Sequence, residues 1–524
     1  MTTLDPDLRS VQEARDALKA AKKALRSFEN TSQEKVDAIC EAMVAAAMRE
    51  AAALGREAHE ETGFGKPDHK RIKNEFAAAS VWAEIKDRKT CGVLREIPER
   101  GITEIGAPVG VIVALVPSTN PTSTAIYKIL IAVKARNAIV VAPHPAAARC
   151  TARAVQVMID AGRAAGMPEG LVSCLTTITA SGTEELMSHP LTSLVLATGG
   201  PGMVKAAHSG GKPAIGVGPG NVPVYVDRSA DIEDAARKII ASKSFDCSTI
   251  CASEQAILAD APIAERLKQA LVRNGAHWLD RDEANRLGAM MFRPNGMGTA
   301  ESVGKTPQAL GELAGIKVPA DARVLIADLE GIGPAHPLSR EKLTSVLGFM
   351  VVDDWRQGCE RATEMLRFGG DGHSMALHTT DMDVALAFGL EKPAFRVLVN
   401  TWSSLGGVGG TTGLVPALTL APGGIGGAAV SDNITVDHVL NTRRIARHLV
   451  DPPAGADDPW GGLAGRPVAG STGQSAAAAP VASAPASVPA SGGTVVGTTA
   501  APAEVVDEIV RKVMSALTQG GLSG

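Results

Sequence analysis

Apolar positions recur at helical spacing near the start of the chain. Residues 7–62 predict helices, because apolar residues return every three or four positions while charged residues fill the other faces. The segment 31–34, Thr-Ser-Gln-Glu, has the composition of a capping box before a second apolar stripe. Further on, polar and apolar residues mix around Pro98 and Gly101, so residues 93–105 predict a β-hairpin.

From residue 109 the pattern changes to short apolar runs separated by amphipathic segments. The runs are rich in Val, Ile, Leu and Ala, as buried strands are, and the segments between them have helical spacing. Strand, helix and strand in this order predict a parallel sheet that helices cover on both faces. The predicted strands are 109–116, 138–142, 171–175 and 194–197, and the predicted helices are 122–135, 146–165 and 182–188.

A second α/β unit begins at about residue 230. It contains a histidine loop at 368–373 and a glycine-rich stretch at 403–427, inside which 417–420 predicts a strand. The last folded element is predicted as a helix over 436–449. The other elements predicted here are the helices 232–243, 264–274 and 281–287 and the strands 256–259, 324–327 and 396–399.

Composition changes sharply after residue 450. Residues 451–502 are almost all Ala, Pro, Gly, Ser, Thr and Val, which cannot build a core and predict a disordered linker. Residues 503–519 predict a helix with one apolar face, and such a helix on a long tether is expected to dock on a partner. Its apolar stripe consists of Val506, Ile509, Val510, Val513 and Leu517.

Charge and cysteine content argue against several classes of protein. The net charge of the 524 residues is −4, so no nucleic-acid partner is expected. The seven cysteines form no CxxC pair, which argues against a disulfide framework or a metal site and favours a reducing cytosol. The N-terminus has no apolar signal core and no apolar run is long enough to span a bilayer, so a cytoplasmic protein without a membrane partner is expected.

Two loops and one cysteine are candidates for chemistry. Residues 117–121 and 198–202 each follow a predicted strand and open a helix, where backbone N–H groups suit a pyrophosphate. Neither loop is a GxGxxG fingerprint. Cys251 lies between a polar loop and the strand predicted at 256–259, so it is placed to present a thiolate, although most free cysteines are structural.

These segments resemble the CoA-acylating aldehyde dehydrogenases of the aldehyde dehydrogenase superfamily, above all the aldehyde half of bifunctional alcohol/aldehyde dehydrogenases and the microcompartment enzymes for acetaldehyde and propionaldehyde. The resemblance covers about residues 1–450. It implies an α/β fold with two Rossmann-like parallel-sheet domains and an oligomerisation hairpin and strand. The motifs that carry it are VPSTNPTSTAIYK (116–128), NAIVVAPHP (137–145), ATGGPGMVKAAHSGGKPAIGVGPGN (197–221) and SKSFDCSTICASEQ (242–255).

The resemblance implies roles for individual residues. Cys251 matches the catalytic nucleophile and His373 a histidine near the reaction centre. Glu341 sits like the glutamate that holds the nicotinamide ribose, in a loosely matching motif, and His144 stands where non-acylating relatives carry a ribose-binding lysine. Cys247 departs from the usual small polar residue or asparagine. The other residues implied to contact NAD are Pro117, Ser118, Thr119, Asn120, Pro145, Thr198, Gly199, Gly200, Pro201, Gly202, Met203, Gly216, Val217 and Gly218.

The sequence also indicates which molecule would accept the acyl group from a thioester at Cys251. The alkoxide that forms when its thiolate attacks an aldehyde needs donors, expected from the Cys251 N–H and the side chain of Thr119 or Asn120. Hydrolytic relatives then activate water with a glutamate in a Glu-Leu-Gly-Gly run, but the corresponding run 215–221 has none, and no Asp or Glu occurs over 187–226. A thiol acceptor needs less help from a base, so transfer to coenzyme A is favoured.

The expected activity is therefore NAD-dependent oxidation of acetaldehyde or propionaldehyde to the acyl-CoA, by a dimer or tetramer. NAD is favoured over NADP because no basic cluster follows the second strand, while His144 leaves NADP open as the alternative. The alternatives are a hydrolytic aldehyde dehydrogenase, a phosphorylating semialdehyde dehydrogenase and a non-catalytic microcompartment scaffold. Residues 503–519 resemble the encapsulation peptides of microcompartment cargo, so a shell protein is an expected partner and a microcompartment the expected location. The expected domains are 1–229 (NAD-binding, with the hairpin at about 94–107), 230–428 (catalytic), 429–450 (return to the oligomerisation and NAD part), 451–502 (linker) and 503–519 (encapsulation helix).

Overall fold

Helices open the part of the chain that the structure describes. The computed structural model describes residues 5–450, and its first two helices confirm the predicted helical spacing. Ser32 begins the second helix by accepting a hydrogen bond from the N–H of Lys35. Within residues 5–450 no helix combines the length and the apolar character needed to cross a bilayer. The opening helices are α1 (Pro6–Phe28), α2 (Gln33–Thr62), α3 (Pro67–Glu75) and α4 (Val81–Ile85).

The alternation predicted after residue 109 is confirmed as a parallel sheet of five strands in the order β5-β4-β3-β6-β7. The strand order reverses between β3 and β6, and an open α/β sheet has its binding crevice at such a reversal, outside the carboxyl ends of the strands. The strands are β3 (Val111–Val116), β4 (Ala138–Pro143), β5 (Val172–Cys174), β6 (Leu194–Thr198) and β7 (Ala214–Val217), and the helices are α5 (Pro121–Lys134), α6 (Ala148–Ala164), α7 (Ala180–Ser188) and α8 (Pro201–Ser209).

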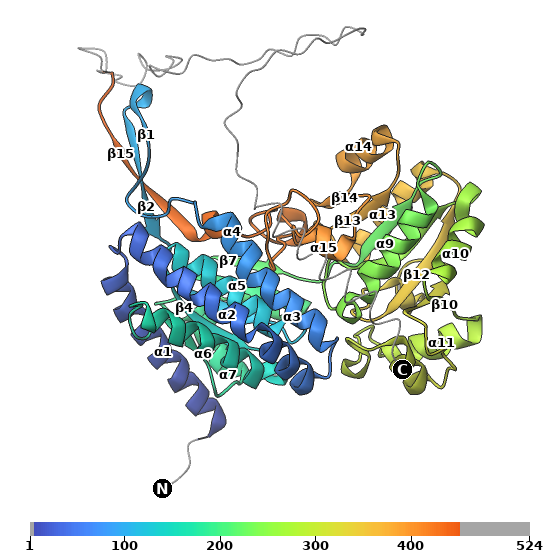
Figure 1. The fold of residues 1–524 in the computed structure, drawn as a ribbon, viewed down its shortest axis with the longest axis horizontal. Coiled ribbons are helices and arrows are strands. Elements are labelled where there is room, and N and C mark those ends of the chain that lie inside the picture. Colours follow the sequence, from blue (N-terminus) through green and yellow to red (C-terminus); the bar gives the residue numbers. More distant parts are fainter. Residues whose placement is uncertain (1–4, 451–524) are drawn as a thin grey trace.

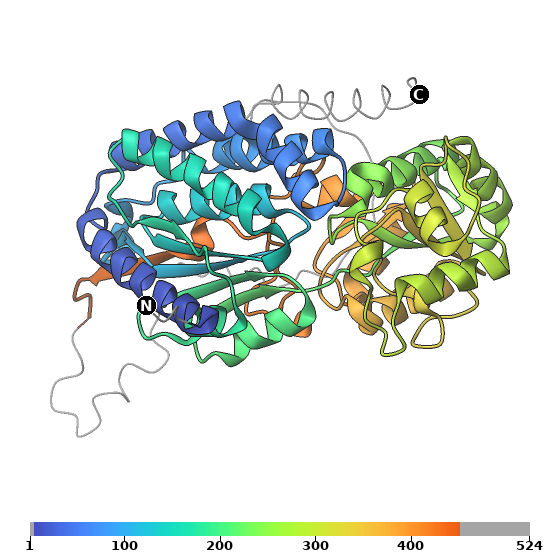
Figure 2. The same cartoon turned by 90° about the horizontal axis from the view of Figure 1, so that it is seen from below.

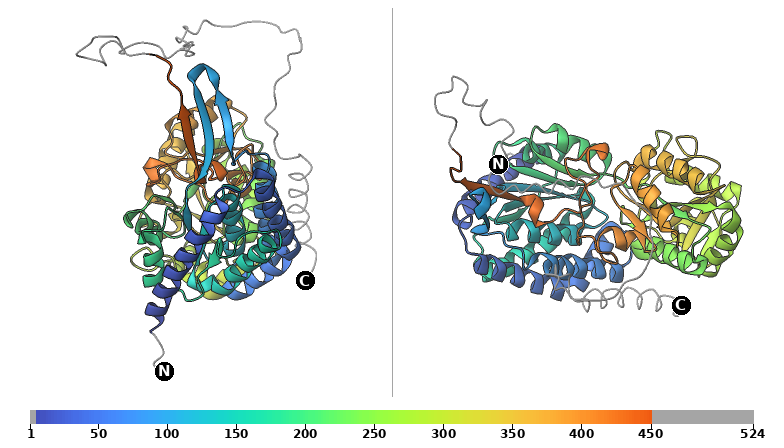
Figure 3. Two further views of the ribbon diagram at one scale, coloured as in Figure 1. Left: turned by 90° about the vertical axis from the view of Figure 1, so that its left-hand side faces the viewer. Right: turned by 90° about the horizontal axis from the view of Figure 1, so that it is seen from above.

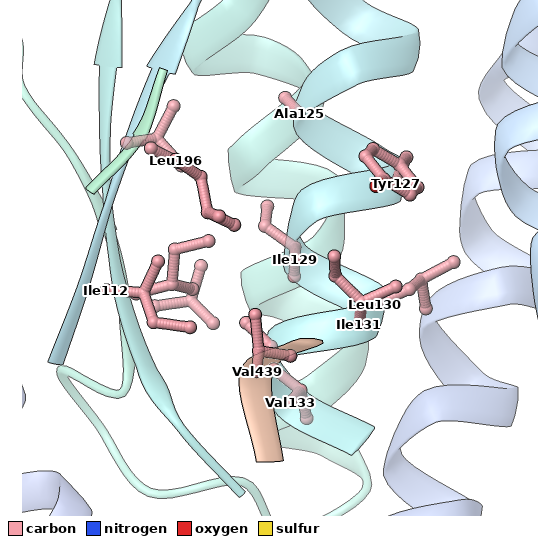
Figure 4. Packing of buried hydrophobic residues seen from close by; sticks show 14 of the residues in the cluster. Ile112, Ala125, Tyr127, Ile129, Leu130, Ile131, Val133, Leu196 and Val439 are labelled. Carbon is pink, nitrogen blue, oxygen red and sulfur yellow. The ribbon is translucent and has the colours of Figure 1, made fainter. Parts of the chain in front are cut away.

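The helix α5 lies at the centre of this first lobe. All of its residues are buried, and its sequence is apolar on nearly every face, as is typical of a helix enclosed by other elements. In Figure 4, Ile129 and Val133 of α5 lie on the side of Ile112 and Leu196, which belong to the sheet. Because α5 is held on all sides, the loop that precedes it has a fixed end at the carboxyl edge of the sheet.

The second lobe is a parallel sheet of seven strands in the order β10-β11-β12-β9-β8-β13-β14. Separate apolar clusters cover its two faces, one with α9 and α10 and the other with α13 and α14. Figures 1 and 2 show the two lobes side by side. The strands are β8 (Val222–Val226), β9 (Glu254–Asp260), β10 (Ala276–Trp278), β11 (Val324–Asp328), β12 (Val346–Val352), β13 (Met375–His378) and β14 (Val397–Val399). The helices are α9 (Ile232–Ser244), α10 (Ala264–Arg273), α11 (Arg281–Met291), α12 (Pro307–Ala314), α13 (Trp355–Gly369), α14 (Met382–Glu391) and α15 (Ser403–Gly407).

A three-stranded antiparallel sheet projects from the first lobe (Figures 1 and 3). It contains the predicted hairpin, β1 (Val93–Ile97) and β2 (Ile102–Pro108), and a third strand, β15 (Leu440–Ala446). The helix predicted over 436–449 is therefore wrong. Apolar residues return at near-helical spacing there, but pairing with the free edge of β2 decides the conformation.

The remaining sequence predictions concern a strand at 417–420 and the segments after residue 450. The strand predicted at 417–420 is wrong, because only Leu420 makes a β-bridge, to Asn433. The linker predicted at 451–502 and the helix predicted at 503–519 lie outside the described residues.

Candidate active site

A cavity of about 1150 Å³ lies between the carboxyl edge of the first sheet and the second lobe. The first lobe contributes loops that follow β3, β4, β6 and β7, which is where the reversal of strand order predicts a crevice. The second lobe contributes Ile250, Cys251, Glu341 and Leu343. The cavity therefore brings the predicted nucleophile and the predicted dinucleotide loops together.

Most residues expected to contact NAD line this cavity. The exception is Gly216, which lies inside β7, where an added Cβ would come within 2.6 Å of Val204 and His208. Its role is therefore packing against α8. The expected residues that do line the cavity are Pro117, Ser118, Thr119, Asn120, His144, Pro145, Thr198, Gly199, Gly200, Pro201, Gly202, Met203, Val217, Gly218 and Glu341.

The first-lobe wall leaves open space for a ligand. A Cβ added at Gly200, Gly202 or Gly218 would meet no atom of the protein within 4 Å. Pro201 begins α8, and no side chain caps this helix, so the N–H of Gly202 in its first turn lies beside this space. Burial lowers the pKa of His144, which lies on the same wall and is therefore neutral at pH 7. Uncharged, open backbone of this kind fits the phosphates and ribose of a dinucleotide.

Cys251 lies on the second-lobe wall, half-buried, three residues before β9. Burial, together with the nearby Glu341, raises the pKa of its thiol to about 12, whereas the charge of Arg396 acts in the opposite direction. The thiol is therefore protonated in the resting site. The preceding turn is strained, because Asp246, Cys247 and Ser248 have φ of 47°, 49° and 62°.

Glu341 lines the cavity near Cys251. Its carboxylate accepts a hydrogen bond from the N–H of Gly220 at 2.7 Å. Burial raises the pKa of this carboxyl to about 7, against the opposing effect of the Gly220 N–H and of two lysines, Lys243 and Lys342. The carboxyl therefore changes charge near neutral pH.

Asn120 faces the cavity and is hydrogen-bonded to Thr249, which directly follows the strained turn before Cys251. Its Nδ2 donates to the carbonyl of Thr249 at 2.8 Å and, at 3.3 Å, to Oγ1 of Thr119. Its Oδ1 accepts from Nζ of Lys73 at 2.6 Å. The amide group is thus oriented from both ends, and its partner Thr249 lies two residues before Cys251 in the chain.

His373 is fully buried behind the cavity wall and does not line the cavity. Its Nδ1 lies 3.0 Å from Oγ of Ser374, and its Nε2 has no partner within the described structure. Burial lowers the pKa of the imidazole to about 3, so the ring is neutral. Gly220 separates it from Cys251, since a Cβ there would lie 2.0 Å from the Cys251 carbonyl and 3.2 Å from Nδ1 of His373.

The family model described as "Aldehyde dehydrogenase family" matches residues 5–302, more than half of the chain. The chain belongs to the aldehyde dehydrogenase family. "Aldehyde-alcohol dehydrogenase 2" of Entamoeba histolytica is 41% identical to it over 424 residues, 79% of this chain and 49% of that protein. "Succinate-semialdehyde dehydrogenase (acetylating)" of Clostridium kluyveri is 34% identical over 437 residues, 83% of this chain and 95% of that protein. This aldehyde dehydrogenase spans about half the length of the aldehyde-alcohol dehydrogenases it matches.

Solved structures of aldehyde dehydrogenases superpose on this chain. An acetylating aldehyde dehydrogenase from Geobacillus thermoglucosidasius has a TM-score of 0.85 at 47% identity and covers 86% of this chain and 100% of its own. A propionaldehyde dehydrogenase from the Clostridium phytofermentans fucose utilisation bacterial microcompartment has a TM-score of 0.75 at 28% identity, over 83% and 97%. A Rhodopseudomonas palustris propionaldehyde dehydrogenase, with bound CoA and an acylated cysteine, has a TM-score of 0.76 at 27% identity, over 83% and 97%.

Sequence reasoning missed the buried charges beneath the predicted nucleophile of this aldehyde dehydrogenase. Lys70 and Lys73 of α3 both contact the carboxylate of Asp246, at 3.2 and 2.5 Å, and all three side chains are buried. In the sequence alone, two lysines three residues apart on a short polar helix indicate a helix face that is exposed to solvent. Their partner lies more than 170 residues away, so no local signal in the sequence identifies the pairing.

Proposed function

We propose that this aldehyde dehydrogenase oxidises a short-chain aldehyde to its acyl-CoA with NAD. The observation that carries the proposal is a half-buried cysteine, Cys251, at a cavity with no carboxylate on the 215–221 run. Similarity to acetylating aldehyde dehydrogenases and to an enzyme with bound CoA and an acylated cysteine supports it.

The reaction begins at the sulfur of Cys251. The thiol gives its proton to water, and the thiolate attacks the aldehyde carbon to form a thiohemiacetal alkoxide. The backbone N–H of Cys251 and the Nδ2 of Asn120 are the donors that would bind this alkoxide. A bound NAD supplies the acceptor for the hydride that leaves the same carbon. A thioester then remains on Cys251.

The second half of the reaction transfers the acyl group. The thiolate of coenzyme A attacks the thioester carbonyl, and the Cys251 thiolate leaves, which restores the enzyme. Among the described residues that line the cavity, the carboxylates are Glu184 and Glu341. Glu184 is exposed on α7 and Glu341 is bonded to Gly220, so neither takes the place of the water-activating glutamate of hydrolytic relatives. A thiolate needs no such base, which favours coenzyme A as the acceptor.

The proposed substrate is acetaldehyde or propionaldehyde, and the proposed assembly is a dimer or tetramer. The projecting sheet supports an oligomer, because β1 and β15 leave most of their side chains exposed in a single chain. Similarity to a microcompartment enzyme supports a location inside a shell, with residues 503–519 as the part that binds it. A chain that ended at residue 450 and still co-purified with shells would contradict this role.

NADH formation from propionaldehyde or acetaldehyde, with and without coenzyme A, tests the activity. Wild-type turnover is expected to require coenzyme A, and Cys251→Ala is expected to abolish it. Equal turnover without coenzyme A would establish water as the acceptor. Absence of turnover in a folded protein would favour the non-catalytic scaffold.

A further inference from the structure

A buried ion cluster joins the two walls of the active site. Lys70 and Lys73 reach it from α3, and Asp246 reaches it from the turn before the nucleophile. The Asp246 carboxylate also accepts from the Lys66 N–H at 2.7 Å and from Oγ1 of Thr249 at 2.7 Å. The cluster therefore holds the strained turn through several bonds to one carboxylate, which is fully buried.

The two lysines contact different parts of the Asn120 loop. Nζ of Lys70 donates to the main-chain carbonyl of Thr119 at 3.1 Å. Nζ of Lys73 donates to the side-chain Oδ1 of Asn120 at 2.6 Å, to Asp246 and to Oγ1 of Thr249 at 2.9 Å. Nζ also lies 3.4 Å from the carbonyl of Thr249, so four acceptors share the three protons of the Lys73 ammonium. Only Lys73 of this pair contacts the Asn120 amide.

The chemistry of its two neighbours dictates how the Asn120 amide lies. An ammonium group only donates, so the amide oxygen must face Lys73. A carbonyl only accepts, so the NH2 group must face Thr249. The second amide proton points to Oγ1 of Thr119 over a longer distance, 3.3 Å, which leaves it available to an oxygen in the cavity.

We propose that Lys73 is a positioning residue that keeps the Asn120 NH2 group turned toward the reacting oxygen beside Cys251. Without Lys73 only the Thr249 carbonyl would still orient the amide, and in the flipped orientation an oxygen would face the alkoxide. The two lysines and one aspartate also carry a net positive charge, which stabilises a negative oxygen nearby. The inference rests on the proposed thioester chemistry of Cys251.

Burial lowers the pKa of Lys73 to about 8, and the Asp246 carboxylate opposes this effect. The ammonium form therefore persists at pH 7, as the positioning role requires.

The Asp246 carboxylate also leaves no room for a side chain at position 65, which is a glycine. A Cβ at this position would lie 1.9 Å from Oδ1 of Asp246.

The test measures acylation of Cys251 and turnover in the same set of variants. The probe for acylation is p-nitrophenyl acetate, because its carbonyl passes through the same kind of oxyanion, releases p-nitrophenolate and leaves an acetyl thioester on the sulfur. Asn120→Ala is expected to lower both this rate and kcat by about 10²- to 10³-fold. Lys73→Met is expected to lower them by about 10²-fold, with the KM for NAD changed less than about threefold.

Lys70→Met is the matched control, because Lys70 is as buried as Lys73 and is paired with the same carboxylate. It is expected to lower kcat by less than about tenfold, since it does not contact the Asn120 side chain. In the Asn120→Ala background, Lys73→Met is expected to add less than about threefold. If Lys73→Met does not fold, Lys73→Gln replaces it, because glutamine still donates but also accepts, so it no longer dictates the amide orientation.

Three results would overturn the inference. The first is that Lys73→Met lowers the acylation rate as much in the Asn120→Ala background as it does in wild type. The second is that Lys70→Met and Lys73→Met lower kcat equally. The third is that Lys73→Met has wild-type rates. Failure of the proposed function gives a different result from failure of this inference. Wild type would then form no NADH with coenzyme A, but the p-nitrophenyl acetate rates of the variants would still report on the oxyanion donor.

Discussion

The two walls of the cavity are built in opposite ways. The wall of the first lobe consists of strand-end loops in which Gly200, Gly202 and Gly218 leave open space and no buried ion pair is formed by the loop residues. The wall of the second lobe consists of a turn with three successive residues at positive φ, held by a buried aspartate and two buried lysines. Both walls are presented by parallel sheets, so the difference comes from the loops.

This difference matches what the proposed function requires of each wall. A dinucleotide is held by many weak contacts along its length, so backbone N–H groups and open space suffice. A nucleophile and its oxyanion donors must be placed to within a fraction of an ångström, because catalysis depends on donors aimed at the oxygen that develops charge. Buried ion pairs do not favour folding strongly, but they fix geometry where removal of one partner is severely destabilising. The comparison predicts that substitutions in the buried ion cluster mainly lower the free energy of unfolding, whereas substitutions on the open wall mainly weaken binding of NAD.

Asp246→Ala is expected to have the largest effect. It leaves Lys70 and Lys73 buried without their carboxylate and releases the strained turn, so the free energy of unfolding should fall by about 3–5 kcal/mol. Denaturant unfolding measures this loss. Asp260→Ala is the matched control, because Asp260 is equally buried but its partner Arg228 is half-exposed and can turn to water. Equal losses for the two variants would mean that the cluster has no special role.

The sequence predicted the first wall better than the second. The alternation of strands and helices predicts the loops at 117–121 and 198–202 of the first wall, because this signal is contiguous in the chain. On the second wall only the motif around Cys251 is contiguous in the same way. The pairing of α3 with Asp246 is not contiguous, and it exists only once α3 packs beside the turn. The strand β15 was predicted as a helix for the same reason, since its conformation is decided by β2, more than 300 residues earlier.

Gly218→Ala is expected to have an intermediate effect on the open wall. The added methyl group meets no protein atom, so the melting temperature should change by less than about 2 °C. The methyl group occupies the cavity instead, so the KM for NAD should rise by about tenfold, equivalent to about 1.4 kcal/mol. Gly413→Ala serves as the control, because its added Cβ also meets nothing and Gly413 does not line the cavity. An unchanged KM for Gly218→Ala would remove this glycine from the dinucleotide wall.

Glu341→Gln is expected to have the smallest effect, and its sign follows from burial. Burial raises the pKa of the folded-state carboxyl to about 7, above its value of about 4.3 in an unfolded chain. The folded protein therefore binds more protons between these values, and the stability that Glu341 contributes is lost as the pH rises through 7. Wild type should lose about 0.8 kcal/mol relative to Glu341→Gln between pH 6.5 and pH 8, measured by denaturant unfolding. The exposed Glu301→Gln variant gives the reference curve. A wild-type advantage that grew with pH would show that the carboxylate, rather than the neutral acid, is the form that the Gly220 N–H and the two lysines stabilise.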